Sequence, residues 1–264
     1  MNASRLSSRR HLSMALLAGI ALVGCGVDPD AENKEIISNL IASGYPADDI
    51  MVHEGAVYVG RDAHVTLEAS REMMQTSGSQ EQYRTNNIVG FHVSKICVNP
   101  TAAFSSYPKF MWALDLAIQN YNELGRRIYF VRGPTTGCTA NIIADIMSGD
   151  GGLAGYPSGG YPYGIFFIGT VMNNNTYYQV DTVAHVITHE LGHTIGFRHA
   201  DFYNRAISCG GAAINEGDEG AGNVHIPNTP TVATWGGSVM NSCYRQSETG
   251  KFTSSDRAAM YNLY

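Results

Sequence analysis

The chain has 264 residues, of which 44 % are hydrophobic, so it is long enough to bury one substantial core. Its formal net charge is −6, and no cluster of lysine and arginine lies outside the N-terminus, which argues against a nucleic-acid-binding protein. The 29 glycines and 15 tyrosines are typical of a loop-rich exported protein rather than of a helical bundle.

The N-terminus has the features of an export signal. Three arginines between positions 5 and 10 precede an apolar stretch, residues 12–24, that is too short to span a bilayer as a helix. The sequence LVGC that ends at Cys25 is similar to the lipobox of bacterial lipoproteins. We therefore expect residues 1–24 to be a signal peptide and Cys25 to be lipidated, with ordinary cleavage nearby as the alternative. The expected location is the bacterial outer membrane or cell surface, or the medium after secretion.

Residues 25–81 differ in character from the rest of the chain. The spacing of isoleucine and leucine predicts a helix over 31–43, which Gly44 would end. A small hairpin is expected around Glu54 and the glycine after it. A polar stretch then indicates a boundary, so we expect an N-terminal region over 25–81, serving as a pro-segment, spacer or stalk, and a second domain over 82–264.

The order of elements after this boundary indicates an α+β fold. Strands alternate with amphipathic helices, and Pro108 and Gly125 mark the first turn and the end of the first long helix. The predicted elements are strands over 88–94, 127–133, 140–148 and 163–171, and helices over 105–125, 181–196 and 252–264.

The segment HELGHTIGFRH, residues 189–199, is the most informative stretch of the chain. Apolar residues recur with helical periodicity before and within it, so His189 and His193 would project from one helix face, one turn apart. That spacing lets both imidazoles reach one zinc ion at about 2.0–2.1 Å. Gly196 can end the helix, after which His199 would be the third ligand.

Glu190 lies next to the first of these ligands and is the expected general base. It can reach a water beside the ion without taking a coordination position. Three protein ligands are typical of a catalytic rather than a structural zinc site. Two alternatives remain open: a shifted site built on His185 and His189, and Asp201 in place of His199 as third ligand.

The pattern H-E-x-x-H-x-x-G-x-x-H resembles the metzincin signature. Residues 82–264 also resemble the bacterial dual-action HEIGH metallopeptidases, through QYRTNNIV, LAGYPSGGYP, GFRHAD and IPNTP followed by SVMNSC, although Leu191 replaces the isoleucine of the family's name. The resemblance implies a metzincin-like α+β fold. Its upper subdomain would hold a twisted mixed sheet, a backing helix and the zinc helix, and its irregular lower subdomain a Met-turn and a C-terminal helix.

The resemblance also implies roles for individual residues. Met240, in Ser-Val-Met, would be the Met-turn residue that lies beneath the three histidines. Residues 163–170 would form the edge strand along which a substrate lies antiparallel. Astacin- and serralysin-like members carry a tyrosine two residues past the methionine, whereas this chain has Ser242 there and Tyr244 two residues later.

Two acidic features have alternative interpretations. Metzincin pro-segments sometimes mask zinc with a cysteine or an aspartate, and Asp62 is the candidate here, against an ordinary loop aspartate. The loop over 209–230 would form one wall of the cleft, and its acids could bind calcium or be a solvated acidic loop.

The cysteines agree with export to an oxidising compartment. Without Cys25 an even set of four remains, which allows three pairings. Because Cys209 follows the zinc helix and Cys243 follows the Met-turn, we favour Cys209–Cys243, which leaves Cys97–Cys138.

These features together predict a zinc-dependent endopeptidase, which would hydrolyse peptide bonds with a metal-activated water and Glu190 as general base. The alternative function is a lipid-anchored surface binding protein that retains zinc for structural support. The expected partners are a protein or peptide substrate and, through the lipid anchor only, a membrane. Nucleic acid is not expected, and the protein is expected to be a monomer.

Overall fold

The computed structural model describes residues 29–42, 45, 47, 49–73, 82–174, 176–217, 222–230 and 232–264. The predicted signal peptide and the lipidation site at Cys25 lie outside these residues. Within the described ranges, none of the helices combines the length and the apolar character needed to cross a membrane.

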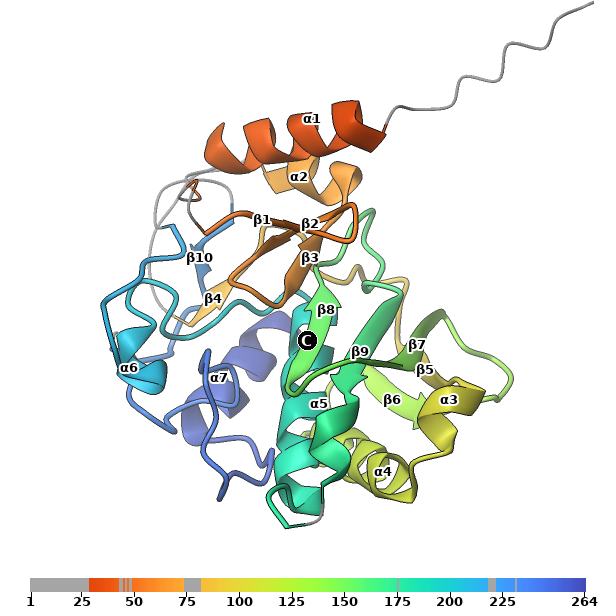
Figure 1. Cartoon of the computed structure of the whole chain (residues 1–264). Helices are drawn as coiled ribbons and strands as arrows, with labels where there is room; N and C mark the ends of the chain where they lie inside the picture. Colours follow the sequence, from red (N-terminus) through yellow and green to blue (C-terminus); the bar gives the residue numbers. More distant parts are fainter. Residues whose placement is uncertain are drawn as a thin grey trace, which may run out of the picture.

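An eight-stranded mixed sheet forms the centre of the molecule (Figure 1). Its order is β1-β2-β3-β8-β9-β7-β5-β6, and β9, β7, β5 and β6 run parallel to one another. Strand β8 is antiparallel to β9, and a separate two-stranded sheet pairs β4 with β10. The strands are β1 (Met51–His53), β2 (Ala56–Val59), β3 (Ala63–Val65), β4 (Tyr83–Arg84), β5 (Lys95–Pro100), β6 (Tyr129–Arg132), β7 (Ala140–Met147), β8 (Gly152–Gly155), β9 (Ile165–Gly169) and β10 (Val224–His225).

Two long helices, α4 and α5, pack against each other beside this sheet (Figure 1). Residues 182–194 of α5 are all buried, which explains why its sequence is apolar around the histidines. The helices are α1 (Pro29–Ala42), α2 (Leu67–Met73), α3 (Ala102–Ser105), α4 (Pro108–Asn122), α5 (Val180–Thr194), α6 (Ala206–Cys209) and α7 (Ser254–Leu263), with a 3-10 turn η1 (Thr170–Asn173).

The main core lies between the sheet and these two helices. Apolar side chains at helical spacing on α4 meet alternate side chains of the strands, as in the fully buried Leu114, Ile142 and Phe166. Burying a side chain of this size contributes about 1.5–3 kcal/mol. The α+β class and the mixed sheet predicted from the sequence are confirmed.

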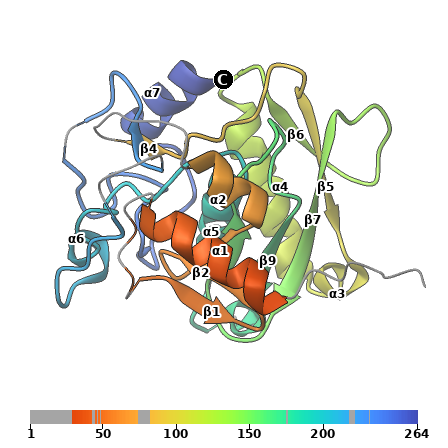
Figure 2. The ribbon, with the colours of Figure 1, turned by 90° about the horizontal axis from the view of Figure 1, so that it is seen from above.

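The N-terminal residues form a second, smaller core against the same sheet. Helices α1 and α2 lie over the β1–β3 strands, as Figures 1 and 2 both show. Ile36 and Leu40 of α1 pack with Val57 and Val65 of the strands, and Tyr156, which follows β8, joins them. Strand β3 pairs in parallel with β8, through Ala63 opposite Ala154. Residues before position 82 are therefore part of the continuous sheet.

Several predicted elements agree with the structure. The helix over 31–43 corresponds to α1, and the hairpin turns at Glu54 and Gly55, whose φ angles are 49° and 79°. Positive φ at both central positions is what a tight hairpin turn requires. Helix α7 begins with the capping box of Thr253 and Asp256.

One predicted strand is absent, and another lies at a different place in the sheet than expected. Residues 88–94 form no strand, because the chain turns at Gly90, where the Val93 N–H donates to the Gly90 carbonyl, and β5 begins only at Lys95. The predicted strand over 163–171 exists as β9, but it is an interior strand between β8 and β7 rather than the edge strand beside the cleft. Between β9 and the N-terminal strand β3 lies the glycine-containing β8, which the hydrophobic pattern did not predict and which is also an interior strand of this sheet.

Candidate zinc site

Helix α5 and the turn after it bring three histidines together. Nε2 of His193 lies 3.0 Å from Nε2 of His189, and Nε2 of His199 lies 3.2 Å from the same atom. His189 and His193 lie one turn apart on the helix. Gly196, with a φ of 108°, ends the helix and lets the chain return so that His199 faces them. The site places together the three histidines that the sequence predicted.

The other ring nitrogen of each histidine is held by an oxygen. Nδ1 of His189 lies 2.9 Å from the Val239 carbonyl, and Nδ1 of His193 lies 2.8 Å from the Phe197 carbonyl. Nδ1 of His199 lies 2.9 Å from a carboxylate oxygen of Glu216. Because each acceptor requires a proton on Nδ1, each ring, when it is neutral, directs an unprotonated Nε2 at the same point.

This arrangement fits a zinc ion. Three nitrogen lone pairs that face one another inside the protein repel unless a cation lies between them. Ligand atoms at about 2.0–2.1 Å around a tetrahedral zinc stand about 3.3 Å apart, close to the separations found here. Outer hydrogen bonds from the ligating rings to carbonyl and carboxylate oxygens are also typical of zinc sites. Within the described residues, the cluster able to hold a metal consists of the three histidines and Asp62.

Burial gives the ligand side chains unusual proton affinities. Burial, followed by the charge on His199, lowers the pKa of His189 to about 4, and burial lowers that of His193 well below its usual range. Both rings are therefore neutral and ready to bind a metal at neutral pH. Burial opposes a charge on His199 too, yet the carboxylates of Asp62 and Glu216 raise its pKa to about 10.

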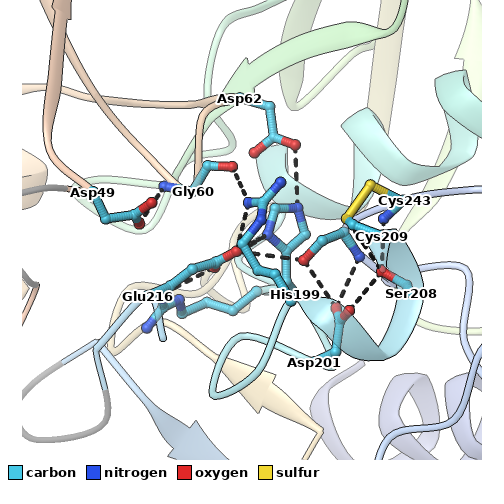
Figure 3. A network of polar contacts seen from close by, with 12 residues as sticks. Asp49, Gly60, Asp62, His199, Asp201, Ser208, Cys209, Glu216 and Cys243 are labelled. Carbon is cyan, nitrogen blue, oxygen red and sulfur yellow. Dashed lines mark hydrogen bonds and ion pairs between the residues drawn. A yellow bond between two sulfur atoms is a disulfide. The ribbon is translucent and has the colours of Figure 1, made fainter. Parts of the chain in front are cut away.

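Asp62 approaches the histidines from the N-terminal region. Its Oδ2 lies 3.2 Å from Nε2 of His199 and 4.0 Å from Nε2 of His189, and its Oδ1 lies 3.9 Å from Nε2 of His193. The backbone carbonyl of Asp62 accepts from the N–H of Ala154 in β8 at 3.1 Å, which fixes the residue beside the sheet. Figure 3 shows this carboxylate directed at His199. It stands where a fourth ligand would.

Glu190 lies in a cavity beside these residues. A cavity of about 110 Å³ is lined by Glu190, His189, Asp62, Gly152 and Tyr244 among others. The Glu190 side chain is buried, and its Oε2 has no hydrogen-bond partner. Burial, and then the charge of Asp62, raise the pKa of Glu190 well above its usual range. An unpartnered, buried carboxylate next to a metal cluster is suited to exchange a proton with a substrate or water.

Met240 packs against the helix between the first two histidines. A Cβ added to Gly192 would lie 2.5 Å from the Met240 sulfur, so the two residues are in close contact. The N–H of Ala200, which follows His199, donates to the Met240 carbonyl at 2.7 Å. Met240 is thus buried against both parts of the metal-binding segment.

A family model describes most of the chain. The model of the dual-action HEIGH metallo-peptidases matches residues 57–264. The chain belongs to the dual-action HEIGH metallopeptidase family. It is therefore a zinc metallopeptidase, and the match begins before β3, so it includes Asp62 as well as the three histidines.

Two solved structures have a limited similarity to this HEIGH metallopeptidase. One is high choriolytic enzyme 1, a hatching enzyme zinc-protease from Oryzias latipes (medaka fish), with 15 % identity, a TM-score of 0.42, and coverage of 72 % of this chain and 98 % of that chain. Another is myroilysin, with 13 % identity, a TM-score of 0.27, and coverage of 46 % of this chain and 60 % of that chain. No curated protein sequence matches the chain.

The alternative ligands considered from the sequence lie outside the cluster. His185 lines the cavity that contains Glu190, but its Nδ1 has no hydrogen-bond partner and it does not join the three histidines. Asp201 accepts from the N–H of Ser242 at 2.8 Å and from the Ser208 hydroxyl at 2.6 Å. It therefore links the segment after His199 to the segment after Met240 (Figure 3).

The sequence did not decide whether Tyr244 contacts the metal site. It lines the Glu190 cavity, and its ring centre lies 5.9 Å from that of His185. Burial and then the neighbouring Tyr178 raise the pKa of its hydroxyl. Tyr244 thus lies beside the Glu190 cavity without belonging to the metal cluster of the described residues.

Glu216 is the site residue that the sequence interpretation missed. The loop over 209–230 was expected to present solvated acids or a calcium site, but the Glu216 side chain is fully buried on His199. Glu216 lies in a glycine-rich loop that also contains Glu219, and no periodicity or motif distinguishes it there. The structure offers no support for calcium at this residue.

Two disulfides hold the site and the sheet. Cys209 is bonded to Cys243, joining the segment after His199 to the segment after Met240 (Figure 3). Cys97 in β5 is bonded to Cys138, just before β7. The pairing is the one favoured from the sequence.

Proposed function

We propose that this protein is a zinc-dependent endopeptidase in which His189, His193 and His199 hold the metal and Glu190 is the general base. The observation that carries the proposal is the convergence of three Nε2 atoms beside the buried carboxylate of Glu190, whose Oε2 has no hydrogen-bond partner. When bound, zinc supplies a Lewis acid that polarises the scissile carbonyl and makes a water molecule more acidic.

The residues of the chain then have distinct roles. Glu190 takes a proton from the attacking water and returns it to the leaving amine. Met240 acts as the Met-turn residue and supports the helix at Gly192. The edge of β8 beside Glu190 is where a peptide would bind through main-chain hydrogen bonds.

In this structure the N-terminal region occupies that edge, so we propose that it is an inhibitory pro-segment. Strand β3 pairs with β8, and Asp62 reaches the histidines. A carboxylate at the fourth ligand position excludes both water and substrate. Export as a lipoprotein through Cys25, followed by removal of the N-terminal region, is the order of maturation that this proposal implies.

The test compares two variants of the full chain: Asp62→Ala, and Asp62→Ala combined with Glu190→Gln. Zinc content and cleavage of an unbiased peptide library are measured for both. The proposal expects equal zinc content, cleavage by the first variant, and a rate at least about 10²-fold lower in the second, because a general base contributes that much. Zinc bound without cleavage by either variant, also after a single proteolytic cut between Met73 and Gln82 followed by dilution, would favour the lipid-anchored binding protein.

A further inference from the structure

The outer partner of His199 differs in kind from the partners of the other two ligands. His189 and His193 each face a neutral backbone carbonyl, whereas Nδ1 of His199 lies 2.9 Å and 3.1 Å from the two carboxylate oxygens of Glu216. A hydrogen bond to a charged acceptor is roughly twice as strong as one between neutral groups. His199 is therefore the most strongly oriented ring of the three.

Glu216 is itself held firmly from several directions. Arg205 Nη1 donates to its Oε1 at 2.7 Å, and Arg198 Nη2 lies 3.5 Å from its Oε2. The Glu216 N–H donates to the Phe202 carbonyl at 2.7 Å, three residues after His199. Figure 3 shows the Glu216 side chain beside His199.

We propose that Glu216 is a positioning residue for the zinc site, which fixes the tautomer and orientation of His199 and strengthens its Nε2 as a donor to the metal. A carboxylate behind a ligating histidine raises the basicity of the ring, and its loss typically costs ten- to hundredfold in metal affinity. The positive charges of the two arginines compensate the buried negative charge of the carboxylate. This inference rests on the zinc site of the proposed function.

The experiment measures the zinc dissociation constant of the full chain by competition with a chelator. Glu216→Gln keeps an oxygen acceptor but removes the charge, and we expect it to weaken zinc binding ten- to hundredfold. Glu216→Asp restores the charge and should recover part of the affinity. The matched control is Asp49→Asn, because Asp49 is a buried carboxylate of the same network that accepts from the Gly60 N–H at 3.0 Å and does not touch a histidine. Its zinc affinity should stay within about threefold of the wild type.

Cobalt(II) substitution supplies a second measurement, because its visible absorption reports the ligand field. Glu216→Gln should shift that spectrum and Asp49→Asn should leave it unchanged. Equal zinc affinity in Glu216→Gln and the wild type, or an equal loss in both variants, would overturn the proposal. Neither measurement needs peptidase activity, so an inactive protein would contradict the proposed function and leave this test intact.

If Glu216→Gln does not fold, a measurement on the wild-type protein still tests the proposal. In the zinc-loaded chain, the Nδ1 proton of His199 should resonate further downfield than those of His189 and His193, since only its acceptor is charged. A His199 proton that resonates together with the other two would show that the carboxylate adds nothing, and the proposal would be wrong.

Discussion

Oδ2 of Asp62 lies 3.2 Å from Nε2 of His199, although the two residues are far apart in the chain. The contact joins the N-terminal region to the third proposed metal ligand. Asp62 and His189 line the same cavity as Glu190, and burial followed by the charge of Asp62 raises the pKa of Glu190.

Replacing Asp62 should activate the unprocessed chain. A hydrogen bond to a charged group contributes about 1.5–3 kcal/mol, so Asp62→Ala should raise peptide cleavage by the full-length protein roughly tenfold to a hundredfold. The matched control is Arg61→Asn, an exposed neighbour whose φ of 73° asparagine tolerates. Initial rates on one fluorogenic peptide are sufficient. Equal rates for Asp62→Ala and the wild type would show that Asp62 does not inhibit peptide cleavage.

Gly152 should be essential for the position of Glu190. A Cβ at residue 152 would lie 2.3 Å from Oε1 of Glu190 and 2.5 Å from its Cγ. Gly152→Ala therefore displaces the proposed base, and a displacement near 1 Å can cost about 10²-fold in kcat. Gly164→Ala is the control, because a Cβ there meets no atom within 4 Å. Both variants should keep zinc, as metal analysis would show, and a normal kcat in Gly152→Ala would contradict the predicted clash.

The two disulfides should have separable effects. They close loops of similar length, 34 and 41 residues, so removing either should cost about 2–4 kcal/mol of unfolding free energy. Only Cys209–Cys243 joins the segment after His199 to that after Met240. Replacing that pair by serine should also weaken zinc binding, by roughly tenfold as for other changes behind a ligand. Replacing Cys97 and Cys138 should leave zinc affinity unchanged, and equal zinc loss in both variants would refute the distinction.

His185 should make the protein sensitive to acid. Burial, and then the charge of His189, lower the pKa of His185 to about 3. Since the folded-state value lies below the unfolded value, its contribution to stability is fully present above about pH 6.5 and is lost as the pH falls toward 3. His185→Gln should therefore reduce the slope of unfolding free energy between pH 6 and 4 by about 1.4 kcal/mol per pH unit.

Chemical denaturation of chelator-treated protein at several pH values measures this slope. Chelator treatment keeps metal release out of the comparison. His92→Gln is a suitable control because His92 is exposed. The prediction fails if His185→Gln and the wild type lose stability in parallel.

Local chemistry explains which parts of this structure the sequence predicts. The histidine pair, the helix that carries it and the C-terminal helix depend on spacings within a few residues, and they appear as expected. Strand β8 was not predicted, because the glycines at both of its ends leave little hydrophobic pattern. The roles of Asp62 and Glu216 depend on contacts between distant segments, through β3 on β8 and a loop folded back on His199, which no local pattern encodes.

The pairing of β3 with β8 has a kinetic consequence. Because the segment is covalently joined to the enzyme, it competes with peptides as a tethered ligand whose effective concentration is of millimolar order and does not change on dilution. Substrates at micromolar concentration would rarely displace it. One cut between Met73 and Gln82 would convert this unimolecular competition into a bimolecular one. Dilution would then release the freed fragment, and activation would be irreversible.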